Sequence, residues 1–426
     1  MFMSAQHRTT GHNKSGGSLS PVFLCRLLLG LWLVTQPGLA KAVEAPQVPM
    51  QILIYGGNGF MGTRTSELLI EAGHELTLVN RGNWYWDSEF TVKPHTKHIT
   101  CDRAQAIEKC SELKDFLSHS EGLDAVIDFS AYHPQFIEDA LILLKGKVGF
   151  YIYISTDSVY EVCAKNHTEP SLETDAVRPF CPQRQAELEA AENYGHLKLS
   201  CEEVLARHRA DGSGPPYISL RLPDVVGPRD STYRWWIYQL WMTLRPFLEK
   251  DVIVPARLVE RPMSLVYVED VAATILQLVQ GRNEYKSTPP SEGPPLDQAY
   301  NLALRESPTL FQLLKDMREA LNLSDSVTIK TDGGEETMYL YPSVNAGPVS
   351  IGKAEKYLGW SPTAYSTVVK ETVEYYEKAI SKMYLDHPRR HMIHTMQTYF
   401  TSKPYDVIRG LGEVYKVFFG QRRDEL

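Results

Sequence analysis

The sequence feature that most constrains the fold is a glycine-rich turn at the end of a short apolar run. Residues 51–62 read Q-I-L-I-Y-G-G-N-G-F-M-G, so that Gly56, Gly59 and Gly62 recur at every third position. An uninterrupted run of β-favouring apolar residues is typical of a parallel strand that is buried on both faces. A helical pattern begins at about Phe60. The stretch therefore predicts a strand, a tight turn and a helix in direct succession.

This strand–turn–helix unit predicts a dinucleotide site. The first glycine permits the tight turn, the second allows the backbone to approach a pyrophosphate, and the third lets the helix pack closely on the strand. The N-terminal N–H groups and the dipole of the helix then favour the negatively charged phosphates. The residues expected to bind the cofactor here are Gly56, Gly57, Asn58, Gly59, Phe60, Met61 and Gly62.

Strand and helix patterns alternate along the first half of the chain. Expected strands cover residues 75–79, 98–101, 124–128, 148–154 and 217–222, and expected helices cover residues 60–73, 104–117, 134–144 and 183–208. This alternation predicts an α/β fold of the Rossmann type, a doubly wound parallel sheet with right-handed crossovers and helices on both faces. The ligand crevice is then expected beyond the carboxyl ends of the strands.

The pattern changes after residue 229, which predicts a second, smaller and discontinuous C-terminal substrate domain. We expect residues 1–42 to form a signal peptide and residues 50–229 the dinucleotide-binding domain, completed by about 263–281. The substrate-binding part is expected from residues 230–262 and 282–383, followed by a less regular C-terminal extension over residues 384–426. Expected helices in this half cover residues 268–279, 310–321, 350–358 and 367–383. Ser350 is expected to be the N-cap of the third of these helices.

Both ends of the chain carry targeting signals. Val22–Val34 is an apolar run that follows basic residues and precedes small residues, which predicts a secretory signal and no membrane span after its removal. Arg26 interrupts the run, so a retained membrane anchor is the alternative. The final residues Arg423–Leu426 read R-D-E-L and resemble a retrieval signal of the endoplasmic reticulum. We therefore expect a protein of the endoplasmic reticulum lumen that binds the retrieval receptor.

The net charge and the cysteines indicate which partners, disulfides and metal sites to expect. The formal net charge is −8 without a block of like charges, which disfavours nucleic acid because its binders usually carry a basic footprint. Five cysteines remain beyond the leader; Cys163 and Cys181 are candidates for a bridge, with buried free thiols as the alternative. No C-x-x-C spacing occurs, so we expect no metal site. Asn166 and Asn322 begin glycosylation acceptor sequences.

A hydroxyl, a phenol and an ammonium form the candidate catalytic group. Tyr194 and Lys198 are four residues apart and share one face of the expected helix. A neighbouring ammonium favours the phenolate, so such a pair can exchange a proton with a substrate oxygen. Thr156 lies at the end of the fifth strand, one element earlier, where its hydroxyl can bind the same oxygen. On their own, Tyr194 and Lys198 would be read as a surface pair; Thr156 changes that interpretation.

These features, in this order and spacing, resemble an extended short-chain dehydrogenase/reductase of the NAD-dependent epimerase/dehydratase group, over residues 50–360. The resemblance implies bound NAD(H) or NADP(H), a homodimer formed through two long helices, and a triad of Thr156, Tyr194 and Lys198, with Lys198 also binding the ribose. Asp157 stands where sugar-nucleotide dehydratases keep an acidic catalyst. Ser158 replaces their adjacent glutamate, which argues against dehydratase chemistry.

The end of the second strand decides the choice of cofactor. A carboxylate there would bind the 2′-hydroxyl of NAD, whereas an arginine accommodates the 2′-phosphate of NADP. The chain has Asn80 and Arg81, so we favour NADP(H) over NAD(H). Asp102 and Arg103, after the third strand, are expected beside the adenine, with helix capping as the alternative. Asp128, after the fourth strand, is a weaker candidate for a direct role.

Two positions depart from epimerases of the group and bear on the substrate. Asp224 stands where their diphosphate-binding asparagine is expected, and Met263 stands at the position of their arginine. Arg261 is a substitute for that arginine if the strand extends far enough, and Arg234 is a candidate to reach an anionic group. An unpaired carboxylate near a diphosphate would be repulsive. A nucleotide sugar and another hydroxylated small molecule both remain candidates.

Two hypotheses follow for the function. The first is an NADP(H)-dependent oxidoreductase or epimerase that acts on a hydroxyl or carbonyl group of a sugar-like small molecule. The second is a catalytically silent dinucleotide-binding or carbohydrate- or protein-binding protein, because this architecture also occurs in RNA-binding proteins of chloroplasts. The cluster of Trp235, Trp236 and Trp241 favours a core or lid over a sugar-stacking platform.

Overall fold

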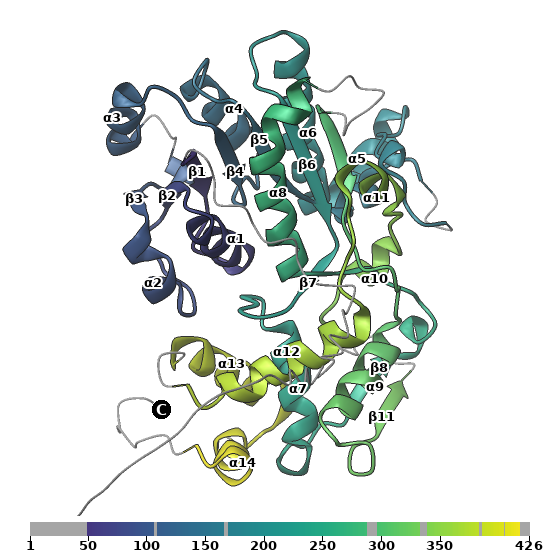
Figure 1. Cartoon of the computed structure of the whole chain (residues 1–426). Helices are drawn as coiled ribbons and strands as arrows, with labels where there is room; N and C mark the ends of the chain where they lie inside the picture. Colours follow the sequence, from purple (N-terminus) through teal and green to yellow (C-terminus); the bar gives the residue numbers. More distant parts are fainter. Residues whose placement is uncertain are drawn as a thin grey trace, which may run out of the picture. The chain divides into compact units, whose positions relative to one another are not determined.

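The centre of the fold, in the computed structural model, is a seven-stranded sheet whose paired strands all run parallel (Figure 1). The strand order is β10-β6-β5-β4-β1-β2-β3. The bounds are β1 Gln51–Tyr55, β2 Glu75–Asn80, β3 Lys97–Thr100, β4 Ala125–Asp128, β5 Tyr151–Thr156, β6 Tyr217–Leu222 and β10 Gln298–Asn301. The strand order reverses between β1 and β4, which places the ligand crevice of such a sheet at their carboxyl ends. The predicted doubly wound sheet is confirmed.

The structure describes residues 49–105, 109–165, 169–287, 296–332, 339–382, 386–403 and 405–417, and these residues all belong to one compact unit. The predicted leader, the acceptor at Asn166 and the terminal R-D-E-L lie outside these ranges. Their predictions, and the predicted domain boundaries, stay predictions.

Helices cover both faces of the sheet. On one face α1 (Phe60–Glu71) packs beside α8 (Val268–Ser287), and on the other lie α3 (Ser111–His119), α4 (Pro134–Leu143) and α6 (Asn193–Ala210). Strand β1 shows how the sequence builds both layers. Ile52 and Ile54 enter the apolar cluster under α1 and α8, whereas Leu53 and Tyr55 enter the cluster on the opposite face. Because successive side chains of a strand point to opposite faces, only an uninterrupted apolar run buries both.

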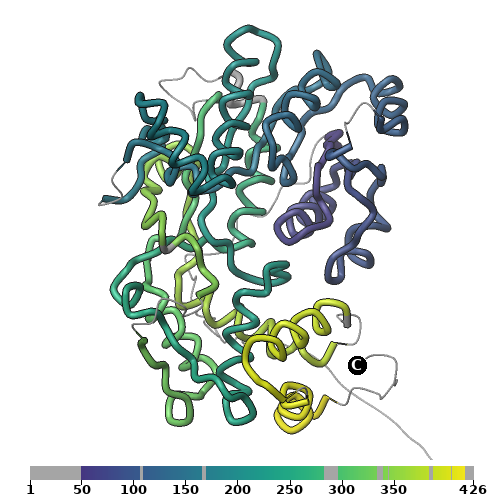
Figure 2. Tube along the Cα trace, turned by 180° about the vertical axis from the view of Figure 1, so that it is seen from behind, coloured from purple at the N-terminus to yellow at the C-terminus, as the bar shows by residue number. Residues whose placement is uncertain are grey.

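A third apolar cluster lies among the C-terminal helices, below the sheet in Figure 1 and again in the view from behind (Figure 2). It is built from α7 (Arg234–Thr243), α9 (Leu310–Ala320), α12 (Tyr365–Ala379), α13 (Asp386–Phe400) and α14 (Asp406–Tyr415). Trp235, Trp236 and Trp241 are at most 4% exposed within it, so their prediction as core is confirmed. Two small parallel sheets pair β7 (Asp224–Val226) with β9 (Leu265–Tyr267) and β8 (Val252–Pro255) with β11 (Ile329–Asp332).

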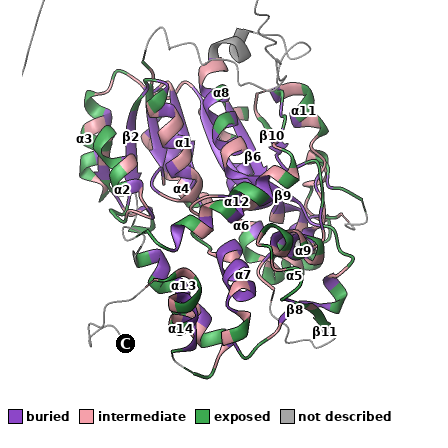
Figure 3. Ribbon diagram, turned by 60° about the horizontal axis from the view of Figure 1, so that its bottom comes forward, coloured by how far each residue is buried: buried purple, intermediate pink, exposed green. Residues whose placement is uncertain are grey.

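Colouring by burial separates the central elements from the covering ones. The strands of the central sheet and much of α7 are buried, whereas the outer faces of α3 and α11 (Gly352–Leu358) are exposed (Figure 3). Among the residues that the structure describes, no helix is long and apolar enough to cross a bilayer. Within the same ranges, no group of three or more His, Cys, Asp and Glu side chains is arranged to hold a metal ion.

The expected helix over residues 183–208 is two helices, α5 (Pro182–Ala191) and α6. The break falls at Glu192, whose side chain accepts a hydrogen bond of 3.1 Å from the backbone N–H of Gly195 and so caps α6. Gly195 packs so tightly that a Cβ atom there would lie 2.1 Å from the carbonyl oxygen of Ser158. This close approach fixes the start of α6 against the segment that follows β5.

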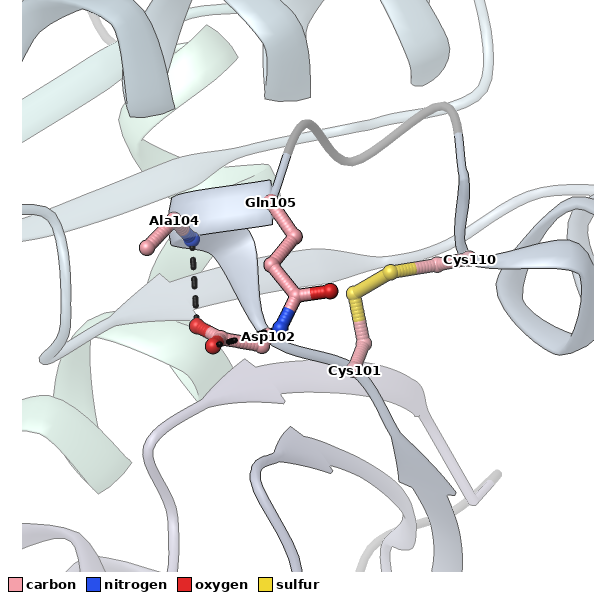
Figure 4. Close-up of a disulfide and its surroundings, with 5 residues drawn as sticks. All are labelled: Cys101, Asp102, Ala104, Gln105 and Cys110. Atoms are coloured by element: carbon pink, nitrogen blue, oxygen red, sulfur yellow. Dashed lines mark hydrogen bonds between the residues drawn. A yellow bond between two sulfur atoms is a disulfide. The ribbon is translucent and has the colours of Figure 1, made fainter.

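The expected helix over residues 104–117 starts only at Ser111, because a disulfide joins Cys101 to Cys110 just before it (Figure 4). The Cα atoms of the two cysteines are 5.6 Å apart. Cys163 and Cys181 are both free, so the candidate bridge between them is wrong. The alternative, a buried free thiol, holds for Cys163 but not for Cys181, which is free and exposed.

Two further expectations about the C-terminal half are wrong, and one expected helix is confirmed with shifted bounds. Ser350 is not an N-cap, since α11 begins at Gly352 after Ile351 and no side chain caps it. The helix expected over residues 367–383 is α12, which covers Tyr365–Ala379. The extension expected to be less regular contains α13 and α14, whose apolar faces complete the third cluster.

Candidate active site

A cleft of about 880 Å³ opens at the carboxyl edge of the central sheet. The glycine turn, the ends of several strands, the start of α6 and the segments 223–234 and 342–345 line it. Of the predicted site residues, only Gly57 and Arg261 are not in the lining, which includes Gly56, Asn58, Gly59, Phe60, Met61, Gly62, Asn80, Arg81, Asp102, Arg103, Thr156, Asp157, Tyr194, Lys198, Asp224 and Arg234. The structure thus brings together residues that are far apart in sequence.

The glycine turn has the shape that a dinucleotide requires. Gly56 has a φ of 81°, which favours glycine, and a Cβ atom at Gly62 would lie 2.2 Å from the carbonyl oxygen of Gly56. A Cβ atom at Gly59 would meet that same oxygen only at an ordinary 3.6 Å. Gly57 faces the protein instead, where a Cβ atom would lie 2.6 Å from Leu78. The absent side chain of Gly59 therefore leaves room on the cleft side, and the turn fits a pyrophosphate.

The end of β2 forms the adjoining wall. Arg81 is exposed and lines the cleft. The Asn80 Oδ1 atom accepts a hydrogen bond of 2.7 Å from the Gly82 N–H, while its buried Nδ2 has no partner within the described chain. The Asn58 side chain donates to the Asn83 carbonyl and fixes the glycine turn to this wall. An unpaired buried donor in a cleft fits a ligand that accepts a hydrogen bond there.

Arg103 lines the cleft, where its place beside the adenine stays a prediction, and its guanidinium is engaged within the protein. Its Nη1 atom donates to both carboxylate oxygens of Asp128, at 2.7 and 2.8 Å, and the buried Asp128 also accepts from the Tyr151 hydroxyl. Asp128 also accepts from the Ser130 N–H at 3.0 Å and so caps the loop after β4, beneath the cleft. Asp102 accepts from the Ala104 N–H at 3.1 Å, so the capping alternative is confirmed for it (Figure 4).

Thr156, Tyr194 and Lys198 line the same part of the cleft. Thr156 ends β5, and Tyr194 and Lys198 lie one turn apart on α6. Lys198 is 2% exposed, and its Nζ donates to the carbonyl oxygens of Ala131 and Ile154 at 3.1 and 2.6 Å. Burial lowers the pKa of this ammonium to about 8. The fold therefore brings the hydroxyl, the phenol and the ammonium to one cleft, and their catalytic roles stay predictions.

The phenol of Tyr194 is the most exposed of the three groups. Its residue is 44% exposed, and its ring lies 6.4 Å from that of Tyr132. Burial of the hydroxyl raises the pKa above its usual value, Tyr132 raises it further, and a hydrogen bond with Thr156 lowers it. Lys198 is not among the leading influences on this pKa. At neutral pH Tyr194 therefore carries its proton and is suited to donate it.

Asp157 and Asp224 lie on the other side of the triad. The Asp157 Oδ1 atom accepts from the Thr156 hydroxyl at 3.3 Å, and burial together with Asp224 raises the pKa of Asp157 to about 8. Asp224 pairs with Arg234 and accepts from the Ser343 N–H at 2.9 Å. Asp224 is therefore a paired carboxylate, and Arg234, the candidate to reach an anionic group of the substrate, is engaged by it.

Comparison with known proteins agrees with this geometry. The model of the NAD dependent epimerase/dehydratase family matches residues 52–289, more than half of the chain. The chain belongs to this family. Its similarity to the chloroplast stem-loop binding protein of 41 kDa b from Arabidopsis thaliana is 33% identity over 348 residues, which cover 77% of this chain and 79% of that protein. NAD(P) binding is typical of the family.

Solved structures of family members share the fold. The UDP-glucose 4-epimerase of Thermotoga maritima, solved with UDP-glucose, is 22% identical, covers 78% of this chain and all of its own, and superposes with a TM-score of 0.57. The UDP-N-acetylglucosamine 4-epimerase of Methanobrevibacter ruminantium, solved with UDP-N-acetylmuramic acid, is 19% identical and covers 78% of this chain and 99% of its own, with the same TM-score. At these identities the likeness concerns the fold.

The substrate side of the family cleft differs from expectation at Arg261. Strand β9 starts at Leu265, so Arg261 is not part of it; its side chain is exposed and donates to the Asn345 carbonyl at 3.4 Å. Sequence reasoning also missed Glu161, Glu192 and Ser343, which line the cleft. Glu161 lies four residues after Asp157, so its place near the cleft could have been predicted from the sequence. Ser343 lies 119 residues from Asp224 and carries no local signal.

The buried ammonium of Lys198 predicts a pH-dependent stability. Its pKa is about 8 in the folded protein against 10.5 ordinarily, so between these values the unfolded chain binds a proton that the folded one has released. Stability therefore rises with pH in this window, by about 3 kcal/mol in total at 1.36 kcal/mol per pKa unit. We expect Lys198→Met to lack this rise in urea unfolding of the full chain. Lys114→Met, at an exposed site, should keep it; equal slopes in both variants would contradict the assignment.

Proposed function

We propose that this protein is an oxidoreductase or epimerase of the endoplasmic reticulum lumen that uses NADP(H) in preference to NAD(H). Its substrate is a sugar-like small molecule that reacts at a hydroxyl or carbonyl group. The observation that carries the proposal is the convergence of Thr156, Tyr194 and Lys198 in one cleft with the glycine turn. A protein that only binds has no physical need for all three groups at that place.

Each residue of the group has a distinct task. Tyr194 donates the phenolic proton to a substrate oxygen in one direction and accepts it in the other. The Thr156 hydroxyl holds that oxygen. Lys198 places a buried positive charge beneath the site, where it favours negative charge on nearby oxygens. A bound nicotinamide dinucleotide supplies or accepts the hydride, and the residues fitted to hold it are the glycine turn, Asn80 and Arg81.

The test of the proposal is a pair of equilibrium titrations of the full chain with NADPH and with NADH, read by tryptophan fluorescence. Binding of NADPH that is tighter than binding of NADH supports it. Absence of binding for both dinucleotides would leave only a silent binding protein. The structural relatives are solved with nucleotide sugars, so UDP-glucose and its unlinked sugar are the first ligands to add to the NADPH complex.

Arg81→Ala tests the choice of cofactor. A hydrogen bond between a guanidinium and a phosphate contributes about 1.5–3 kcal/mol, so we expect NADPH to bind roughly 10- to 100-fold more weakly and NADH to bind as before. Arg184→Ala, at a side chain that is 60% exposed on α5, should change neither affinity. Equal losses for both dinucleotides in Arg81→Ala would remove Arg81 from the phosphate site.

Three features support the location in the lumen. The chain ends in R-D-E-L, begins with a signal-like segment, and contains the disulfide between Cys101 and Cys110. Disulfides persist in oxidising compartments and are rare in the cytosol. The acceptor Asn322 lies exposed at a turn, where a glycosylating enzyme can reach it. Retention in the lumen is tested by deleting the last four residues, which should send the protein into the medium.

A dinucleotide-binding protein without turnover is the second candidate. The relative from Arabidopsis thaliana, 33% identical, is named for binding a stem-loop, so membership of the family does not by itself imply catalysis. The net charge of −8 argues against RNA as the ligand of this chain. Binding of NADPH without oxidation in the presence of any carbonyl substrate would favour this candidate. Homodimer formation through two helices per subunit stays a prediction.

A further inference from the structure

The substrate side of the cleft is rich in carboxyl groups. Five of them line the cleft there, and Arg234 is the lining guanidinium beside them; the carboxyl groups belong to Asp157, Glu161, Glu192, Asp224 and Asp230. Arg261 lies at the edge of this side, where it donates to the carbonyl oxygen of Asn345. Arg234 is already paired with Asp224, and Asp230 accepts from both the backbone and the hydroxyl of Thr232. Within the described chain, Asp157, Glu161 and Glu192 have no cationic partner in ion-pair distance. Because one oxygen of Glu192 caps α6, Asp157, Glu161 and the second oxygen of Glu192 are left for a ligand.

A separate observation at Asp157 points to a ligand. This residue is 2% exposed and lines the cleft, and its Oδ2 atom has no hydrogen-bond partner among the described residues. Buried polar atoms are nearly always paired, because leaving one unpaired costs free energy. A hydrogen-bond donor on a bound molecule would give this buried oxygen the partner that such atoms usually have. The same wall contains Ser343, whose N–H donates to the Asp224 carboxylate at 2.9 Å.

The raised pKa values of these carboxyl groups agree with a site that a positively charged ligand completes. Burial raises the pKa of Glu161, the neighbouring Glu192 adds to this rise and Arg261 opposes it, and the resulting pKa is about 7. Burial and then Asp224 raise the pKa of Asp157, with Glu161 contributing and with Ser343 and Thr156 opposing. Burial raises the pKa of Asp224 to about 6 despite Arg234. A cation held among these carboxyl groups would favour their ionised forms.

We propose that the substrate side of the cleft binds a hydroxyl-rich small molecule that carries a primary amine and no diphosphate. The proposal rests on the proposed function for the position of the reacting end, beside Thr156 and Tyr194. The ammonium lies among Asp157, Glu161 and Glu192, and the hydroxyl groups of the ligand donate to the remaining carboxylate oxygens. A diphosphate in the same place would face these carboxyl groups, whereas the Arg234 guanidinium is already paired with Asp224 and Arg261 is engaged with the Asn345 carbonyl.

The test compares two matched probes on the full chain in the presence of saturating NADPH. The probes are 1-amino-1-deoxyglucitol and glucitol, which differ only by an amine in place of a hydroxyl group, and UDP-glucose is the third ligand. By calorimetry we expect the amine to bind about 10-fold or more tightly than glucitol, since a favourable charge pair at a partly buried site is worth at least a factor of ten. UDP-glucose should bind more weakly than the amine.

Two further measurements separate charge recognition from a general effect. Repeating the amine titration at neutral pH in buffers of different ionisation enthalpy should reveal release of protons, because the ammonium displaces them from the carboxyl groups. Glu161→Gln should reduce the preference for the amine about 10-fold and leave the NADPH affinity unchanged. The matched control is Glu121→Gln, at an exposed site away from the cleft, and it should preserve the preference.

Equal affinity for the two polyols, no binding of the amine at millimolar concentration, or tightest binding of UDP-glucose would each overturn the proposal. Proton release in the wild-type chain tests the idea even if Glu161→Gln does not fold. The two proposals fail in different ways. Loss of the amine preference with intact NADPH binding removes this inference alone, whereas absence of NADPH binding removes the proposed function and is measured first.

Discussion

Gly62→Ala is expected to abolish dinucleotide binding and to destabilise the fold, whereas Gly59→Ala should abolish binding alone. At Gly62 the added Cβ atom would lie 2.2 Å from the Gly56 carbonyl oxygen and 2.8 Å from the Cα atom of Gly57. Both obstacles are backbone atoms, so α1 must move away from β1. Forced overpacking of this kind costs about 1–3 kcal/mol or more.

At Gly59 the protein itself offers no such obstacle. The residue has a φ of −90° and a ψ of −169°, which any residue adopts, and its Cβ atom would meet the Gly56 oxygen at 3.6 Å. The methyl group would instead occupy the space that a pyrophosphate needs. We expect the urea midpoint of Gly59→Ala to equal that of the wild type and its NADPH affinity to fall at least about 100-fold, the equivalent of about 2.7 kcal/mol.

The comparison of the two variants is informative because their effects on stability differ while their effects on binding agree. Thermal and urea unfolding measure the first, and fluorescence titration with NADPH measures the second. Gly146→Ala, at a surface turn with a φ of 73° and nothing near its Cβ position, is the control for backbone strain away from the cleft. It should lose stability and keep the NADPH affinity of the wild type. Unchanged NADPH affinity in Gly59→Ala would mean that the phosphates lie elsewhere.

Local patterns carried the prediction of the fold and of most of the cleft. The run from Gln51 to Tyr55 and the glycine spacing depend only on neighbours in sequence, and the structure places β1, the turn and α1 as expected. The pair Tyr194 and Lys198 follows from helical spacing in the same way. Each of these signals sits inside one element, where backbone geometry alone decides which side chains meet.

Contacts between distant segments were not predictable from such patterns. Arg103 has the charge of a phosphate-binding residue, but the buried carboxylate of Asp128 holds it, 25 residues away in sequence. Arg234 pairs with Asp224, and Ser343 joins them across 119 residues. The bridge between Cys101 and Cys110 depends on a chain reversal after β3 that no periodicity announces. α13 and α14 gain their burial only from the cluster they cover.

Tyr194→Phe is expected to lower the turnover of a confirmed substrate by about 10²- to 10⁴-fold, the usual contribution of a positioned acid or base. The change removes only the hydroxyl that is hydrogen-bonded with Thr156. The ring, which is 44% exposed and packs beside Tyr132, keeps its contacts. Stability and NADPH affinity should therefore remain at the wild-type values, and the loss should appear in kcat when NADPH absorbance is followed.

Tyr132→Phe is the matched control, because it removes a hydroxyl from the ring 6.4 Å away in the same cleft. It should retain turnover within about threefold, below the 10²-fold minimum expected of a proton-transferring group. Burial raises the pKa of Tyr194, so its phenol stays protonated from pH 6 to pH 8. The ionisation of Tyr194 should therefore cause little change in the rate of carbonyl reduction by the wild type over this range. Equal turnover in Tyr194→Phe and the wild type would show that the proton comes from another residue. The first residue to test would then be Asp157, which is protonated near neutral pH and lies beside Thr156.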